Sequence, residues 1–157
     1  MNAQALAEEV IDIPVQRFAG TEDLPLPRYM TERSSGMDLR AAVEDPVSIP
    51  PGEWRKIPAG FVMALPPGLE AQIRPRSGLA LEHGVSLLNS PGTVDADYRG
   101  EVAVILVNHG KKPFVVHRGF RVAQMVIQRV CRIAWDRGTG PDETPRGAGG
   151  FGHTGTG

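Results

Sequence analysis

Glycine and proline interrupt this sequence so often that long helices are excluded. The chain of 157 residues contains 19 glycines and 14 prolines, spaced roughly every eight to twelve residues, as is typical of sandwiches and barrels built from short strands. A chain of this length can bury one core and is expected to form a single folded domain. The frequent glycines and prolines therefore predict an all-β domain.

The segments between these breaks have the patterns of β-strands. In LEAQIR (69–74), apolar residues alternate with polar ones, as expected when one face of a strand is buried. VAVILV (102–107) is apolar throughout and predicts burial on both faces. Further strands are expected over 11–18, 39–43, 53–57, 60–65, 114–117 and 121–130. This pattern favours a distorted antiparallel jelly-roll barrel as the core domain, residues 1–136.

The end of the chain differs in composition from the rest. Residues 137–157 are rich in glycine, and Phe151 is their only large apolar residue. Such a segment cannot bury enough surface to fold by itself. It is either a disordered tail or a flexible arm whose aromatic ring finds a partner elsewhere.

Composition also limits the class of partner. The formal net charge is −1, from 17 basic and 18 acidic residues, so there is no basic field for general nucleic-acid binding. Cys131 is the only cysteine, which excludes an internal disulfide and a Cys-based zinc cluster. No apolar run could span a membrane, and the acidic N-terminus lacks signal-peptide features. We therefore expect a cytoplasmic protein that binds neither nucleic acid nor membranes.

Two short stretches contain candidate functional groups. SGMDLRA (35–41) places Asp38 just before an apolar strand, although a lone aspartate there more commonly bonds local backbone. RPRSGLA (74–80) offers the guanidinium of Arg76, the hydroxyl of Ser77 and the unobstructed backbone of Gly78, a combination that could cradle a phosphate. A surface turn with solvated arginines is the alternative.

The stretch NSPGTVDADYRGEV (89–102) carries the most information. Its Pro-Gly pair marks a turn or a close backbone approach, and a second reversal near Asp97 would fold it into a hairpin leading into VAVILV. Asp95, Asp97 and Tyr98 then gather in one small loop. Paired aspartates in turns also serve as simple backbone caps.

In RVAQMVI (121–127), Gln124 lies inside an otherwise apolar strand. Its side chain needs a partner, because burying an unpaired amide costs about 1 to 3 kcal/mol. Either a neighbouring strand or a ligand would supply that partner.

The order of these stretches, SGMDLRA, RPRSGLA, NSPGTVDADYRGEV, RVAQMVI and then RGAGGFGHTG, resembles the motif series of the trimeric dUTPases. The resemblance spans Ser35 to Gly155. It implies a homotrimer that hydrolyses dUTP to dUMP and pyrophosphate, which keeps uracil out of DNA and supplies dUMP for thymidylate synthesis. It further implies Mg²⁺ on the phosphates and active sites that are each assembled from three subunits.

The resemblance also assigns roles around the nucleoside. Asp95 would be the catalytic residue, the carboxylate that deprotonates a water attacking the α-phosphorus in line. Tyr98 would lie against the deoxyribose and reject UTP. Asn89, with main-chain groups of Gly92 and Ala103, would read the uracil edge.

For the phosphates, the resemblance implies that Arg76, Ser77 and Gly78 bind the α and β groups. The arm of one protomer would close as a lid over a site formed by two others, with Phe151 stacked on the uracil. Gln124, Arg146 and residues 151–154 would reach the γ-phosphate. Asp38 would touch Mg²⁺ only through water. The remaining implied substrate contacts are Thr93, Val94, Gly152, His153 and Thr154.

Two other functions stay open on the sequence alone. Deoxycytidine triphosphate deaminase shares the jelly-roll fold and some phosphate-binding features, but it uses a catalytic glutamate where this chain has VDADY. A non-enzymatic jelly roll, with the glycine-rich tail as a linker, is the other alternative.

Overall fold

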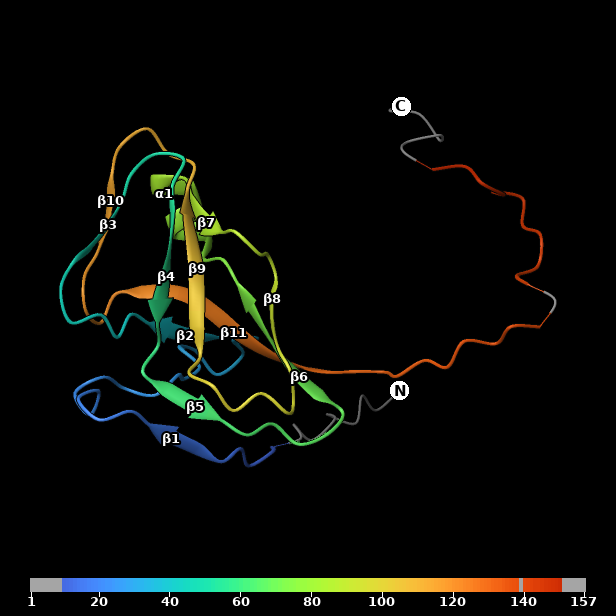
Figure 1. Ribbon diagram of the computed structural model, residues 1–157, viewed down its shortest axis with the longest axis horizontal. Helices are drawn as coiled ribbons and strands as arrows, with labels where there is room; N and C mark the ends of the chain where they lie inside the picture. Colours follow the sequence, from blue (N-terminus) through green and yellow to red (C-terminus); the bar gives the residue numbers. More distant parts are fainter. Residues whose placement is uncertain (1–9, 139, 151–157) are drawn as a thin grey trace, which may run out of the picture.

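The computed structural model describes residues 10–138 and 140–150. Over these residues the chain forms eleven strands and one short helix, and every strand pair is antiparallel (Figure 1). The strands make four sheets, one of four strands, one of three and two of two. The prediction of an antiparallel β fold is confirmed. None of the described helices is long and apolar enough to cross a membrane.

The largest sheet has the strand order β2–β11–β6–β8. The predicted alternation in β6 is confirmed, because Leu69, Ala71 and Ile73 are buried while the residues between them are partly open. The long strand β11 pairs with β2 on one side and β6 on the other, so Met125 lies opposite both Met37 and Ile73. The strands are β2 (Met37–Arg40), β6 (Leu69–Arg74), β8 (Gly92–Val94) and β11 (Arg121–Arg129).

The three-stranded sheet has β9 at its centre, between β4 and β7. The prediction that VAVILV is buried on both faces holds for most of the strand, although Ala103 and Ile105 are only partly buried. The strands are β4 (Trp54–Pro58), β7 (Val85–Leu87) and β9 (Ala103–Asn108).

The remaining strands form two-stranded ribbons at the periphery. One ribbon pairs β1 (Val15–Arg17) with β5 (Phe61–Met63), and the other pairs β3 (Val47–Ile49) with β10 (Phe114–Val116). The predicted strand over 11–18 is thus much shorter than expected. The sequence pattern also missed β3 and β7, which have three residues each. The equally short strands β5 and β10 were found because they lie in the longer apolar runs 60–65 and 114–117.

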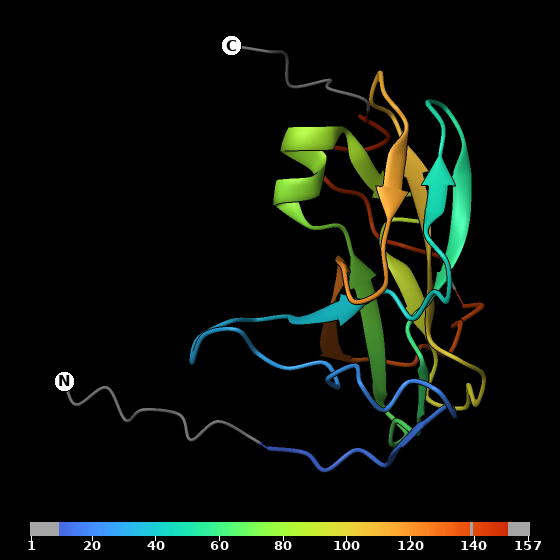
Figure 2. The same cartoon turned by 90° about the vertical axis from the view of Figure 1, so that its left-hand side faces the viewer.

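A short helix, α1 (Ser77–His83), lies on the outside of the sheets next to β7 (Figure 2). The sequence predicts a turn here, but the residues after Gly78 are good helix formers. Gly84 ends the helix in the left-handed conformation, with φ of 66°, and its N–H donates to Ala80 O at 3.0 Å.

One apolar core is shared by all four sheets. Its members come from strands far apart in the sequence, so the sheets depend on one another for burial. The core includes Leu39, Ile49, Ile57, Phe61, Ile73, Val85, Leu106 and Val116.

Asn108 is a fully buried polar residue at the end of β9. Its amide nitrogen donates to Ile49 O and Lys112 O, each at 2.8 Å, and its oxygen accepts from Gly110 N at 2.8 Å. The side chain thereby holds the β9–β10 turn against β3.

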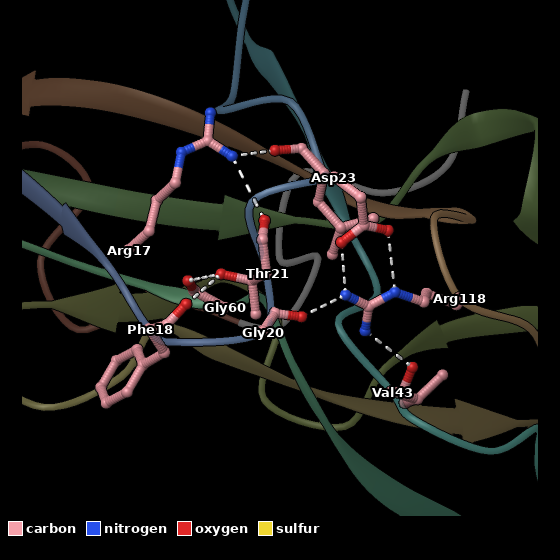
Figure 3. A network of polar contacts seen from close by, with 9 residues as sticks. Arg17, Phe18, Gly20, Thr21, Asp23, Val43, Gly60 and Arg118 are labelled. Carbon is pink, nitrogen blue, oxygen red and sulfur yellow. Dashed lines mark hydrogen bonds and ion pairs between the residues drawn. The ribbon is translucent and has the colours of Figure 1, made fainter.

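Arg118 ties the loop after β1 to the segment that precedes β11 (Figure 3). Its guanidinium donates to both carboxylate oxygens of Asp23, at 2.6 and 3.0 Å, and to the main-chain oxygens of Gly20 and Val43. The hydrogen bonds between the two side chains lower the pKa of Asp23 and raise the pKa of Arg118.

After β11 the chain leaves the sheets and runs outward (Figure 1). Nearly every described residue from Arg129 onward is exposed, including Ile133 and Trp135, which is 83% exposed. The described part of the arm therefore makes few contacts with its own core.

Candidate active site

The predicted hairpin around Asp97 is wrong in its pairing. The reversal exists, because Tyr98 N donates to Asp95 O at 3.1 Å. However, β8 pairs with β6, whereas β9 pairs with β4 and β7, so the two strands on either side of the reversal belong to different sheets. Their separation leaves a gap that a paired hairpin would close.

This gap is a small cavity of about 40 Å³ between β8 and β9. Gly92 is buried at its wall, and a Cβ atom there would come within 3.3 Å of the Asn89 amide nitrogen, so the expected close approach at Gly92 is present. Strand edges carry main-chain donors and acceptors, so the cavity suits a flat group with a hydrogen-bonding edge. Its lining brings together Ile73, Leu87, Asn89, Gly92, Thr93, Val94, Ala103, Val104 and Ile105.

Asp95 and Tyr98 lie in the loop that follows β8. Both are exposed, as is Asp97. The loop is held by its main chain, by Arg99, which donates to Ala96 O at 2.7 Å, and by the Tyr98 hydroxyl. The Asp95 carboxylate thus reaches solvent at the end of the strand that lines the cavity.

The second cluster joins residues of three quoted stretches, 35–41, 74–80 and 121–127. Asp38 accepts Arg76 Nε at 3.1 Å through one oxygen and Arg121 Nη1 at 3.0 Å through the other. Arg76 also donates to the main-chain oxygen of Arg121 at 3.0 Å. The Asp38 side chain is only 15% exposed, so both guanidinium groups are held against the sheet by one carboxylate.

Gln124 has its partner in the neighbouring loop. Its amide nitrogen donates to Pro75 O at 3.0 Å, directly before Arg76. A Cβ atom at Gly36 would lie 2.7 Å from the Gln124 side-chain oxygen, so a larger residue at position 36 would require this amide to shift. A neighbouring segment therefore supplies a partner for the amide nitrogen, and the expected contact of Gln124 with a phosphate stays a prediction.

Ser77 and Gly78 are exposed at the start of α1. A Cβ atom at Gly78 would meet nothing within 4 Å, so no group of the described chain requires a glycine at this position. Their expected contact with a phosphate stays a prediction.

Arg121 is the site residue that the sequence reasoning missed. It begins β11 and stands three residues before Gln124, on the strand that pairs with the strand of Asp38. The sequence signal that could have identified Arg121 is its charged side chain at the start of an otherwise apolar strand. The two-arginine cluster carries a net positive charge and suits an anion.

The cavity and the arginine cluster lie at opposite edges of the four-stranded sheet. Asp38, which holds both arginines, stands on β2, whereas the cavity is lined by β8 and by Ile73 of β6. The order β2–β11–β6–β8 places Asp38 three strand spacings from β8, about 14 Å, so the carboxylate that holds the arginines does not lie beside the cavity of the same chain.

Arg146 is the one predicted site residue of the arm that lies within the described residues. Arg146 is exposed and donates from Nε to Gly149 O at 2.9 Å. Phe151, Gly152, His153 and Thr154 lie outside the described residues.

The described residues contain no group of three His, Cys, Asp or Glu side chains that could hold a metal ion. Asp38 does not fit as a direct ligand, because both of its oxygens accept hydrogen bonds from arginine.

A larger cavity of about 920 Å³ lies between β1 and the end of β11, and it includes none of the predicted site residues.

A narrow cavity between strand edges, an exposed carboxylate beside it and a separate arginine cluster define a β-sheet protein equipped for a planar, anionic ligand. A family model described as dUTPase matches residues 22–155. The chain therefore belongs to the dUTPase family.

Similar proteins agree with this assignment. The chain is 63% identical over 148 residues to a deoxyuridine 5'-triphosphate nucleotidohydrolase of Maricaulis maris, covering 93% of this chain and 97% of that protein. A protein of the same name from Rickettsia felis is 55% identical over 141 residues, covering 90% and 93%.

Solved structures show the same fold. The dUTPase of Staphylococcus bacteriophage 80alpha with dUPNHPP has a TM-score of 0.82 at 18% identity, covering 94% of this chain and all of that one. A mutant dUTPase from phage phi11 of S. aureus, described with a structural Mg(II) ion, has a TM-score of 0.73 at 17% identity, covering 83% and 98%.

Proposed function

We propose that this protein hydrolyses dUTP to dUMP and pyrophosphate, and that each active site combines the cavity of one subunit with the arginine cluster of another. The hydrolysis itself follows from membership of the dUTPase family. The observation that supports a shared site is the placement of the two clusters at opposite edges of one sheet.

The cavity between β8 and β9 would bind uracil. Gly92 and Ala103 line this cavity, together with Asn89, Thr93 and Val94, and their main-chain groups would bond the edge of the base. A site whose donors and acceptors match the edge of one base rejects other bases strongly, because a mismatched base leaves buried polar groups without hydrogen bonds.

Asp95 would act as the general base. Its exposed position lets it hold a water beside the α-phosphorus and take a proton from that water as it attacks. The bond from the α-phosphorus to the bridging oxygen then breaks, and pyrophosphate departs. Tyr98, three residues further on in the same loop, would meet the deoxyribose and leave no room for a 2′-hydroxyl.

The arginine cluster would bind the phosphates, together with Ser77 and Gly78. Gln124 supports this loop through Pro75 O. Magnesium bound to the triphosphate would neutralise part of its charge, held mainly by phosphate oxygens and water, with Asp38 in contact only through water.

The proposed assembly is a homotrimer in which the sheets of each subunit close into a jelly-roll barrel over residues 1–136. The single core shared by all four sheets supports closure. Residues 137–157 would be a flexible arm, with Arg146 and residues 151–154 completing a neighbour's site. The free, exposed Cys131 supports a cytoplasmic location.

The deciding experiment measures pyrophosphate release from dUTP, dTTP, dCTP and UTP side by side, with and without a chelator of divalent cations. We expect rapid release from dUTP alone and strong inhibition by the chelator. Comparable rates on all four nucleotides would contradict the pocket described above, and ammonia release from dCTP would indicate a deaminase.

A further inference from the structure

Tyr98 lies directly against Gly100. A Cβ atom added at Gly100 would come within 2.4 Å of the Tyr98 hydroxyl oxygen, 2.5 Å of Cζ and 2.9 Å of Cε2. Cβ atoms essentially never approach other heavy atoms this closely in folded proteins. The ring can therefore take this place only because residue 100 has no side chain.

The hydroxyl of Tyr98 holds the ring in this position. It donates to Glu101 O at 3.1 Å. The carboxylate of Glu101 accepts Gly60 N at 3.0 Å, which joins this residue to the β4–β5 turn. The ring is thus connected through Glu101 to a rigid part of the fold.

The same loop sets the ring relative to Asp95. Tyr98 N donates to Asp95 O at 3.1 Å, and Arg99 donates to Ala96 O and Tyr98 O at 2.7 and 2.8 Å. The loop is bonded before any ligand arrives, so the ring and the carboxylate start in a defined arrangement.

The contact with Gly100 leaves the rest of the ring accessible. Tyr98 is 44% exposed. A methyl group at position 100 would meet the far end of this side chain and not a buried backbone segment. The ring can move away into solvent, so the substitution should shift the ring while the fold stays intact.

We infer that Gly100 is a specificity-determining positioning residue: it admits the Tyr98 ring to the place where that ring excludes a ribose 2′-hydroxyl. This inference rests on the proposed dUTP hydrolysis and on the proposed contact between Tyr98 and the sugar. Gly100 touches neither the substrate nor the reacting atoms and acts only through Tyr98.

The test compares kcat/KM for dUTP and for UTP in the full-length protein and in Gly100→Ala. We expect the ratio of the dUTP value to the UTP value to fall by at least about tenfold, the effect of a small change in the shape of a pocket. A purely structural defect would lower both values by the same factor and leave the ratio unchanged, which would overturn the inference.

A double-mutant cycle supplies the matched control. In a Tyr98→Ala background, Gly100→Ala should leave the ratio unchanged, because the ring through which residue 100 acts is gone. An equal fall of the ratio in both backgrounds would show that Gly100 acts by another route and would overturn the inference.

Tyr98→Phe provides a second measurement that does not alter the backbone. It keeps the ring and removes the hydrogen bond to Glu101 O, so the ratio should fall, but by less than in Gly100→Ala. An unchanged ratio in Tyr98→Phe would show that the hydrogen bond to Glu101 O does not position the ring. If Gly100→Ala did not fold, this result would overturn the inference. Absence of dUTP hydrolysis by the unaltered protein would refute the proposed function instead.

Discussion

The carboxylate of Asp38 accepts a hydrogen bond from Arg76 Nε at 3.1 Å, and the two residues are 38 positions apart in the sequence. Its other oxygen accepts Arg121. One partly buried acid therefore sets the position of two guanidinium groups that would otherwise be mobile. This arrangement gives Asp38 a definite role before any metal is considered.

Asp38→Asn should weaken substrate binding more than it slows chemistry. The amide has no charge and one acceptor fewer, so one arginine loses a charge-assisted hydrogen bond, a loss of about 1.5 to 3 kcal/mol. We expect KM for dUTP to rise by about tenfold or more with a smaller change in kcat, measured by steady-state kinetics. A KM equal to that of the unaltered protein would contradict the positioning role.

Asp95→Asn should abolish most of the activity without affecting the fold. Loss of a general base typically costs about 10²-fold to 10⁴-fold in rate. Because the side chain is exposed, the melting temperature should stay unchanged, and dUTP should still bind. Turnover at the original rate would remove Asp95 from the mechanism.

Mixed subunits can test whether the site is shared. Chains carrying Arg76→Ala and chains carrying Asp95→Asn should each be inactive alone. Refolded together, they should regain activity, because some sites would then combine an intact cavity with an intact arginine cluster. Light scattering should give the mass of a trimer; a monomer, or a mixture that stays inactive, would contradict the shared site.

Asn108→Ala should destabilise the fold by about 3 kcal/mol, because it leaves the oxygen of buried Ile49 without its partner and also removes the hydrogen bonds to Lys112 O and from Gly110 N. The free energy of unfolding can be measured by urea denaturation. Asp97→Ala, at an exposed position, is the matched control and should change stability by no more than about 0.5 kcal/mol. Equal stability of the two variants would refute the buried role of Asn108.

The Asp23–Arg118 pair should make stability depend on pH. Arg118 lowers the pKa of folded Asp23 below its ordinary value of 3.8, so the pair stabilises the folded state above that value and the contribution is lost as the pH falls through the folded pKa. Asp23→Asn should therefore be less stable than the unaltered protein at neutral pH, and the gap should narrow in acid. Denaturation curves at pH 7 and at pH 3 check this; a gap of constant size would contradict it.

Local patterns predicted the features that depend on local geometry. The alternation in residues 69–74 gave the bounds of β6, and the turn residues located the reversal at 95–98. The short helix α1 was missed because Gly78 reads as a turn residue, although Gly84 carried a helix-end signal.

Long-range pairing could not be predicted from these patterns. Whether β8 pairs with β9 or with β6 is decided by the packing of a core shared between four sheets. The contact of Asp38 with Arg76 depends in turn on the register of β2 and β6 against β11. The arginine cluster is consequently visible only in three dimensions, even though each of its members stands in or next to a recognisable motif.

Trp135 stands two residues before the arm and is 83% exposed, and the chain has only one other tryptophan, Trp54. An indole in water emits at longer wavelength than one packed against protein. The molecule thus carries an intrinsic optical reporter of what its last segment touches. A blue shift on adding a non-hydrolysable nucleotide, lost in Trp135→Phe, would follow the docking of that segment in real time without any label.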